Sequence, residues 1–443
     1  MSTSTTLCAA QRMSFASLIA VLLLLVCAST ASFAEQPAPE PSAGAAVSSW
    51  GTQKHMLGDW GGARTKLAEE HGISFDFFLH TDLLANVKGG QEEKVAGWNR
   101  IRGTMDVDLA RLAGVKGMSF HITGLWNGGV NLGEPRYFGS LATPGGNATP
   151  HLFRLDSFWL QQNLFDDKVS ISAGQISGMD FFGLSPDLGN YVMEPLFYAP
   201  FALFNTYSSW DPATTPAAML KIAPHRSFYY KTMVQAGNRN QIEQDPTGAG
   251  FKIKDGAVWH NEVGFLVGQR TSGASKPKYY PGHYRFGYSY NGSRFVNMKS
   301  GAVEDGNSLF YFMSKQAVWR SDSSNRGLDI RFDLLLSPNE KGVLPYNNEV
   351  VVGAVLNGLI PGRPNDSINF GMNYYGIRDF LNTPANSALG LPVTSEKAFE
   401  INYSAQLTPW FQAMPVVQIY NDLGANPNRG TGVVAGIRTK VNF

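Results

Sequence analysis

Charged and amide side chains recur at every second position along many short stretches of this sequence. Arginine carries a rigid fork of hydrogen-bond donors, aspartate and glutamate carry acceptors, and hydrogen bonds with a charged partner are the stronger ones. A row of such groups on one face can bind a polar solute reversibly. Trp159 shares the phase of Ser157 and Gln161 and would add an aromatic surface. The polar positions that follow this pattern are Asp82, Arg100, Arg102, Asp106, Glu262, Arg285, Asp329, Arg331, Glu400, Gln418 and Arg438.

Motifs for covalent or metal chemistry are missing from the sequence. It contains no HExxH, no GxSxG and no GKS or GKT loop. Cys8 and Cys27 are its two cysteines, and both lie in a segment expected to be removed on export, so a cysteine nucleophile or metal site is excluded. His260 and Glu262 are two residues apart and could touch one metal ion, but a pair of residues lining a wall is favoured. We therefore predict no enzymatic activity, no metal and no cofactor.

The elements that would position these side chains are β-strands, because apolar residues also recur with period two. In residues 327–334, Leu328, Ile330 and Phe332 alternate with Asp329 and Arg331. Successive side chains of a strand point to opposite faces, so each strand has one apolar and one polar face. We expect strands to begin near residues 73, 99, 118, 152, 169, 216, 227, 257, 280, 309, 327, 348, 367, 395, 411 and 431.

Two features favour a membrane barrel over a soluble sandwich, which would also alternate. The apolar face is often aromatic near strand ends, for example at Tyr284, Trp319 and Tyr374. Short connections such as 165–168 also alternate with long ones such as 177–216, as expected when tight turns lie at one end of a barrel and loops at the other. The sequence predicts an all-β fold, a transmembrane antiparallel β-barrel of about 16 strands.

The first residues resemble an export signal rather than part of the fold. Arg12 precedes a short apolar run that ends in small residues, and we expect cleavage after about Ala34. Residues 35–50 are rich in Pro, Ala and Ser and should form a flexible lead-in. Residues 51–72 should form an N-terminal helical segment that stops at Gly72. The barrel is expected over residues 73–443.

The chain finishes with the strand-like stretch Gly436 to Phe443. We expect this last strand to pair with the first one, because an open sheet edge is not viable in lipid. Phe443 would then lie at the periplasmic rim as an apolar anchor, where it can also act as a signal to the outer-membrane assembly machinery. Outer-membrane lipid and lipopolysaccharide would surround the barrel.

The charge balance speaks against a nucleic-acid partner. The expected leader contains Arg12, one of the 36 basic residues, and none of the 35 acidic ones, so the exported chain would carry 35 of each. Nucleic-acid binding calls for a basic surface.

Several segments resemble the carbohydrate-selective porin family, the OprB-type porins, over nearly the whole exported chain. The specific elements are the opening GDWGG, the turn GRPND and the glutamate- and tyrosine-containing block before TPW. The full segments are 57–77, 83–90, 154–176, 358–375, 396–427 and the terminal GIRTKVNF. Two departures concern sugar preference, since family members commonly have glutamate where Asp82 stands and an acidic residue where Ser157 stands.

The resemblance implies a sixteen-stranded channel in the outer membrane of a Gram-negative bacterium that passes glucose-like sugars or small oligosaccharides. It makes Asp82, Arg100, Arg102 and Glu400 the favoured constriction residues. The alternatives are a general or anion-selective porin, a barrel enzyme and a soluble periplasmic binding protein. The sequence leaves open whether the barrel is a monomer or a homotrimer, and whether loop 177–216 narrows the pore.

Overall fold

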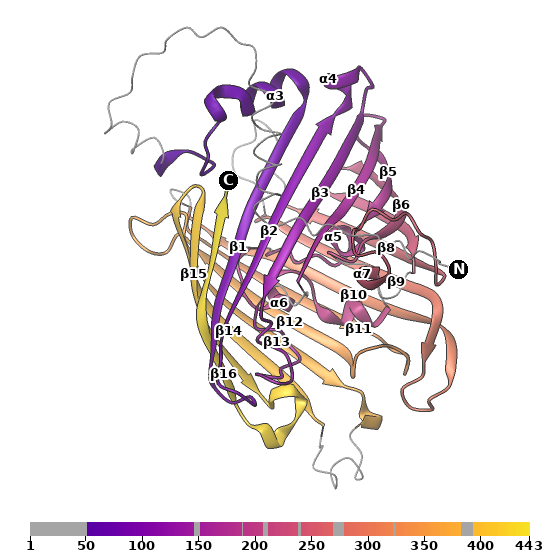
Figure 1. Ribbon diagram of the computed structural model, residues 1–443, viewed down its shortest axis with the longest axis vertical. Helices are drawn as coiled ribbons and strands as arrows, with labels where there is room; N and C mark the ends of the chain where they lie inside the picture. The colour runs from indigo at the N-terminus through magenta and orange to yellow at the C-terminus, as the bar shows by residue number, and fades with distance from the viewer. Residues whose placement is uncertain are drawn as a thin grey trace, which may run out of the picture. The chain divides into compact units, whose positions relative to one another are not determined.

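The computed structural model describes residues 51–145, 151–187, 189–206, 211–237, 241–268, 279–321, 325–381 and 393–443. The predicted leader 1–34 and lead-in 35–50 lie outside these residues. Sixteen strands occupy the described part (Figure 1). They are β1 (Ile73–Lys88), β2 (Val95–Asp108), β3 (Met118–Gly129), β4 (Leu152–Leu164), β5 (Val169–Ile176), β6 (Thr215–His225), β7 (Phe228–Ala236), β8 (Ala257–Val267), β9 (Gly282–Val296), β10 (Val303–Arg320), β11 (Gly327–Leu336), β12 (Tyr346–Asn357), β13 (Ser367–Ile377), β14 (Ser395–Thr408), β15 (Phe411–Asn421) and β16 (Gly432–Asn442).

The strands form one closed barrel in which each pairs antiparallel with its neighbours in the sequence. The ring closes where β1 pairs with β16, and Asp82 lies opposite Arg438 across this seam. Closure leaves no unpaired edge, as a lipid environment requires. The predicted all-β barrel of about 16 strands is confirmed, with the last strand on the first.

The two faces of the strands differ as the sequence pattern predicts. In β11, Ile330 and Phe332 are 36% and 40% exposed, whereas Arg331 and Asp333 are 1% and 0% exposed. The apolar residues form the outer surface and the polar ones face the interior. Most strands begin within a few residues of the predicted positions. The exception is β10, which begins at Val303 rather than near 309, because its first residues pair with the end of β9.

Two short helices, α3 (Ala63–His71) and α4 (Leu109–Ala113), lie at the end of the barrel where β1 begins and β2 ends (Figure 1). The segment η1 (Trp60–Gly62) leads into α3, which ends at Gly72 with a left-handed φ of 68°, a conformation that favours glycine. α4 follows β2 and is capped by the Asp108 carboxylate. No helix among the described residues has the length and apolar character needed to cross a membrane. The remaining helices are α5 (Gly178–Phe181), α6 (Glu194–Phe197), η2 (Phe201–Thr206), α7 (Gln241–Gln244), η3 (Asp379–Leu381), η4 (Leu423–Ala425) and η5 (Pro427–Arg429).

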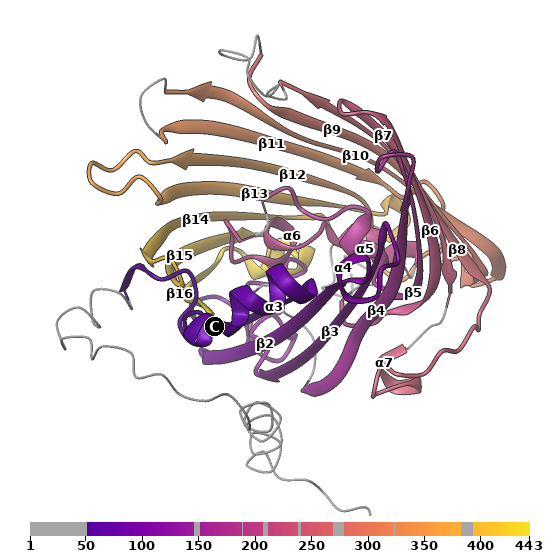
Figure 2. The same cartoon turned by 90° about the horizontal axis from the view of Figure 1, so that it is seen from above.

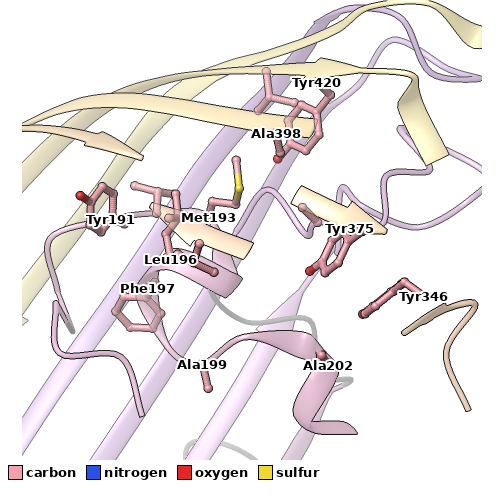
Figure 3. Packing of buried hydrophobic residues seen from close by; sticks show 14 of the residues in the cluster. Tyr191, Met193, Leu196, Phe197, Ala199, Ala202, Tyr346, Tyr375, Ala398 and Tyr420 are labelled. Atoms are coloured by element: carbon pink, nitrogen blue, oxygen red, sulfur yellow. The ribbon is translucent and has the colours of Figure 1, made fainter. Parts of the chain in front are cut away.

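The interior of the barrel contains an apolar cluster in addition to polar groups. Viewed from above, α5 and α6 lie inside the ring of strands (Figure 2). Tyr191, Met193 and Leu196 of this region belong to one buried apolar cluster that also contains Tyr375 and Tyr420 of the wall (Figure 3). These five residues are no more than 1% exposed. Burial of this apolar area fixes a long connection inside the barrel.

Candidate functional site

The described part of the connection between β5 and β6, residues 177–187, 189–206 and 211–214, folds into the barrel (Figure 2) and is called the inward loop below. Wall carboxylates bind its backbone N–H groups. Glu400 of β14 accepts hydrogen bonds from Val192 N at 2.8 Å and Met193 N at 2.6 Å. Glu349 of β12 accepts one from Ala202 N at 2.6 Å. A loop has no strand ladder to satisfy its backbone, so buried loop amides need partners of this kind.

Wall arginines bind the carbonyl groups of the same loop. Arg331 Nη1 donates to Leu196 O at 2.7 Å, and Arg285 Nη2 donates to Leu184 O at 2.8 Å. Arg438 Nη1 donates to Tyr191 O at 3.0 Å. The wall therefore holds the inward loop from several strands by charge-assisted bonds, which are stronger than neutral ones.

Most of the predicted pore-lining residues are engaged with protein groups. Besides Arg285, Arg331, Glu400 and Arg438, Gln418 donates to Pro144 O at 2.8 Å and to Glu400 at 2.9 Å. Asp82 receives both arms of the Arg438 guanidinium, at 2.6 and 2.7 Å.

Glu262 and its neighbour His260 are also surrounded by protein. Glu262 accepts from the hydroxyls of Tyr229 at 2.7 Å and Tyr311 at 2.8 Å, and it lies 2.8 Å from Lys231 Nζ. His260 Nδ1 lies 2.7 Å from Ser289 Oγ. No group of three His, Cys, Asp or Glu residues in the described part of the chain has the geometry of a metal site.

Two of the predicted residues, Arg100 and Arg102, meet three aspartates at the inner edge of the loop. We call this cluster the eyelet: Arg100, Arg102, Asp156, Asp180 and Asp211. Arg102 Nη1 lies 2.7 Å from Asp211, and Arg100 also bonds to Asp211. Arg102 Nη2 lies 3.6 Å from Asp156 and 3.7 Å from Asp180. The side chains of Arg102 and Asp180 are 19% and 23% exposed, so both reach the interior space.

The three groups that the inward loop brings to the eyelet have shifted pKa values. Burial raises the pKa of Asp211, but the charges of Arg100 and Arg102 outweigh this effect and leave its pKa below the ordinary value. Burial raises the pKa of Asp180, and the attraction of Arg102 does not fully offset it. Burial also raises the pKa of Tyr198, whose hydroxyl donates to Asp180 at 3.0 Å. The eyelet therefore combines a strongly ionised carboxylate with a more readily protonated one.

Trp159 and Asp106 meet through a histidine that the sequence analysis did not select. The ring of His121 stacks on Trp159 with centroids 4.7 Å apart, and its Nδ1 lies 2.6 Å from Asp106 Oδ1. His121 Nε2 lies 3.0 Å from Thr123 Oγ1. One face of the Trp159 ring is thus covered by protein, while the Asp106 side chain is 58% exposed.

The sequence analysis also did not select the three aspartates of the eyelet, Asp156, Asp180 and Asp211. Asp156 stands beside Ser157 at an irregularity in the pairing of β3 with β4, where Thr123 pairs with Ser157 and Gly124 with Leu155. The extra residue turns the Asp156 side chain inward, where it is fully buried. An acidic group, Asp156, therefore stands one residue before Ser157 and faces the interior. Asp180 and Asp211 lie in a loop without periodicity, so no sequence pattern could have placed them.

Comparisons with known proteins agree with this architecture. The model of the family described as carbohydrate-selective porin, OprB family, matches residues 92–443. Porin B of Pseudomonas aeruginosa is 26% identical over 431 residues, covering 88% of this chain and 91% of that protein. A high-pH structure of Pseudomonas putida OprB is similar with a TM-score of 0.77 and 19% identity, over 89% of this chain and 99% of that one. Its low-pH structure gives 0.56 and 17% with the same coverage. This chain belongs to the OprB family and is a carbohydrate-selective porin of the Gram-negative outer membrane, a channel and not an enzyme.

Proposed function

We propose that the eyelet is the selectivity site of this channel and that it passes neutral, glucose-like sugars or small oligosaccharides in preference to ions. The observation that carries this proposal is the compensation of Arg100 and Arg102 by Asp211. With Asp156 and Asp180 also close to Arg102, two cations face three carboxylates. Such a site offers many hydrogen-bond donors and acceptors, while its positive and negative charges nearly cancel.

The chemistry of a sugar suits this arrangement. Its hydroxyls both donate and accept, so they can accept from the Arg102 guanidinium and donate to the Asp180 carboxylate. Both side chains are partly exposed, at 19% and 23%, and their existing contacts hold them in place before a solute arrives. Because these groups already have protein partners, a sugar would bind weakly and could leave again, as conduction requires.

The second reading, a general or anion-selective porin, rests on the arginines of the wall. The neighbouring carboxylates count against it, because an anion entering the eyelet would meet Asp180 and Asp211 as well as Arg102. Liposome swelling tests the two readings. Glucose should enter loaded vesicles several times faster than gluconate, a solute of similar size with one negative charge. Equal rates, or faster entry of gluconate, would support the general or anion-selective reading.

We also propose sugar-contacting or lining roles for the other predicted residues within their observed contacts. Asp106 and Trp159 lie nearer than Arg102 to the end of the barrel that carries α4. The remaining residues shape the lumen by holding the inward loop and the wall; they are Asp82, Glu262, Arg285, Arg331, Glu400, Gln418 and Arg438. The fixed loop and wall contacts described above support this division. Substitution of the two groups should separate effects on sugar affinity from effects on pore stability.

The surroundings of the channel complete the proposal. Outer-membrane lipid and lipopolysaccharide contact the apolar outer surface, and the assembly machinery recognises the last strand through Phe443. In support, Phe443 N donates to Phe77 O at 2.8 Å, which places this residue at the barrel rim. The channel works as a monomer or a homotrimer, and cross-linking in intact outer membranes distinguishes these states.

A further inference from the structure

A pocket of about 490 Å³ lies at the end of the barrel where β1 begins and β16 ends. It is called the exit pocket below, because short connections such as those between β4 and β5 and between β14 and β15 lie at this end, as they do at the periplasmic end of bacterial barrels. The N-terminal segment contributes Lys54, His55 and Arg64 to its lining, and Asp76, Asp106 and Lys440 come from the lumen face of β1, β2 and β16. Its volume falls in the roughly 300–1,000 Å³ range of small-molecule sites.

The N-terminal wall of the exit pocket is firmly attached to the barrel. Arg64 Nη1 donates to Phe443 O at 2.9 Å, and its other arm bonds to Phe75 O. Met56 N donates to Asn442 O at 2.8 Å. Arg111 Nη1 donates to Glu69 O at 2.8 Å and thereby ties α3 to α4. The segment 51–72 is therefore held in a fixed position beside the channel mouth by these hydrogen bonds.

The charged side chains of the exit pocket differ from those of the eyelet in one respect. Within the described residues, the side chains of Lys54, Asp76 and Lys440 take part in no hydrogen bond or ion pair. In contrast, the wall charges described above, such as Glu400 and Arg331, are hydrogen-bonded to the inward loop. The ammonium group of Lys440 lies 5.2 Å from the centre of the Phe78 ring, which lies on the lumen face of β1. These free donors and acceptors are available to a solute.

We propose that the exit pocket is a second sugar-binding site, in series with the eyelet, and this inference rests on the proposed sugar selectivity of the channel. Lysine ammonium groups at 54 and 440 donate to sugar hydroxyls, while Asp76 and Asp106 accept from them. Charges of both signs at close range suit a neutral, hydroxyl-rich ligand better than an anion.

A second weak site has a clear physical purpose in a channel. Conduction requires sites that are favourable enough to enter and weak enough to leave, and several weak sites in a row meet this demand. A sugar released from the eyelet would be held at the periplasmic mouth before it diffuses away. The N-terminal segment 51–72 is then one wall of a binding site, which is a function beyond covering the end of the barrel.

The test is the block of single-channel current by glucose added to one side of a planar bilayer at a time. The variant carries Asp76→Asn and Lys440→Met. Its matched control carries Asp167→Asn and Lys168→Met in the exposed β4–β5 turn, at the same end of the barrel but outside the pocket. We expect the pocket variant to bind periplasmic glucose about 5- to 10-fold more weakly, the effect of losing roughly 1 to 1.4 kcal/mol of hydrogen bonding. Block from the extracellular side should change by less than about twofold.

Three other results would contradict the proposal that the exit pocket binds sugar. If the pocket variant behaves like its control while glucose still blocks the wild type, the exit site is wrong and the eyelet proposal stands. If glucose blocks the wild type from neither side, the proposed sugar selectivity fails and the exit site fails with it. If gluconate blocks from the periplasmic side more tightly than glucose, the pocket takes anions rather than neutral sugars. Should the double variant not form channels, Asp76→Asn alone, at an exposed side chain, carries the same test.

Discussion

Arg102 of β2 and Asp211 of the inward loop form an ion pair inside the barrel, with Arg102 Nη1 2.7 Å from Asp211 Oδ2. The pair joins residues 109 positions apart in the chain. It fixes the edge of the loop to the wall, and it cancels the charge that would otherwise attract anions. Under the proposed function, the selectivity of the channel depends on this balance.

Removal of one cation should therefore change both ion and sugar selectivity. Arg102→Met leaves Asp156, Asp180 and Asp211 undercompensated, so the reversal potential in a KCl gradient should shift toward cation selectivity. The loss of a charged donor should also weaken glucose block by roughly 10-fold. Arg294→Met is the matched control, because Arg294 is exposed and lies 4.0 Å from Asp305 outside the eyelet. An unchanged reversal potential in Arg102→Met would contradict this role.

The ion selectivity should depend on pH through Asp180. Burial raises the pKa of Asp180, so this carboxylate takes up a proton at a higher pH than the value of about 3.9 for an exposed aspartate. Asp211 has a lowered pKa and stays ionised over the same interval. Asp180 interacts electrostatically with Arg100, Arg102, Asp156 and Asp211, and it accepts a hydrogen bond from the Tyr198 hydroxyl.

The sign of this effect follows from the charge that is lost. As the pH falls, Asp180 becomes neutral before Asp211, the eyelet becomes more positive, and the anion-to-cation permeability ratio should rise. Reversal potentials measured from pH 8 down to pH 4 check this. Asp180→Asn should show the high ratio already at neutral pH and should lack the pH step. A pH step that survives in Asp180→Asn would assign the titration to another group.

Glu400 should act on the stability of the inward loop and not directly on sugar affinity. Glu400→Ala leaves the N–H groups of Val192 and Met193 buried without an acceptor, at a cost of roughly 1–3 kcal/mol each. We expect larger and noisier single-channel currents, because the loop would leave the wall part of the time. Glu400→Gln keeps an acceptor and should be intermediate. Quiet channels that lose only glucose block in both variants would indicate direct sugar contact.

The seam between β1 and β16 depends on Asp82 and Arg438. Both side chains are 3% exposed, and removal of one partner from a buried ion pair costs about 3–5 kcal/mol. Asp82→Ala should therefore lower the temperature at which the folded barrel changes its mobility on a denaturing gel. Asp305→Ala removes one partner of an exposed pair and should have little effect, because such pairs contribute about 0–1 kcal/mol. Equal shifts for the two variants would contradict a special role of the seam pair.

The strands were predictable because their physical cause is local. A residue such as Phe332 faces lipid and Arg331 faces the interior, and this alternation is visible in the sequence itself. The phase of Arg102 and Glu400 was predicted for the same reason. Their partners were not, because Asp211 and Met193 belong to a loop whose path depends on contacts between distant segments. Asp156 was missed because an irregularity in strand pairing changed the phase of β4 by one residue.

The most direct test of the eyelet is the single-channel current of the refolded protein in a planar bilayer, titrated with glucose on both sides. The wild type should form stable channels whose current falls with glucose and reaches saturation, and Arg102→Met should keep its conductance but lose most of this block. Stable wild-type channels whose current does not respond to glucose would contradict a sugar-selective eyelet.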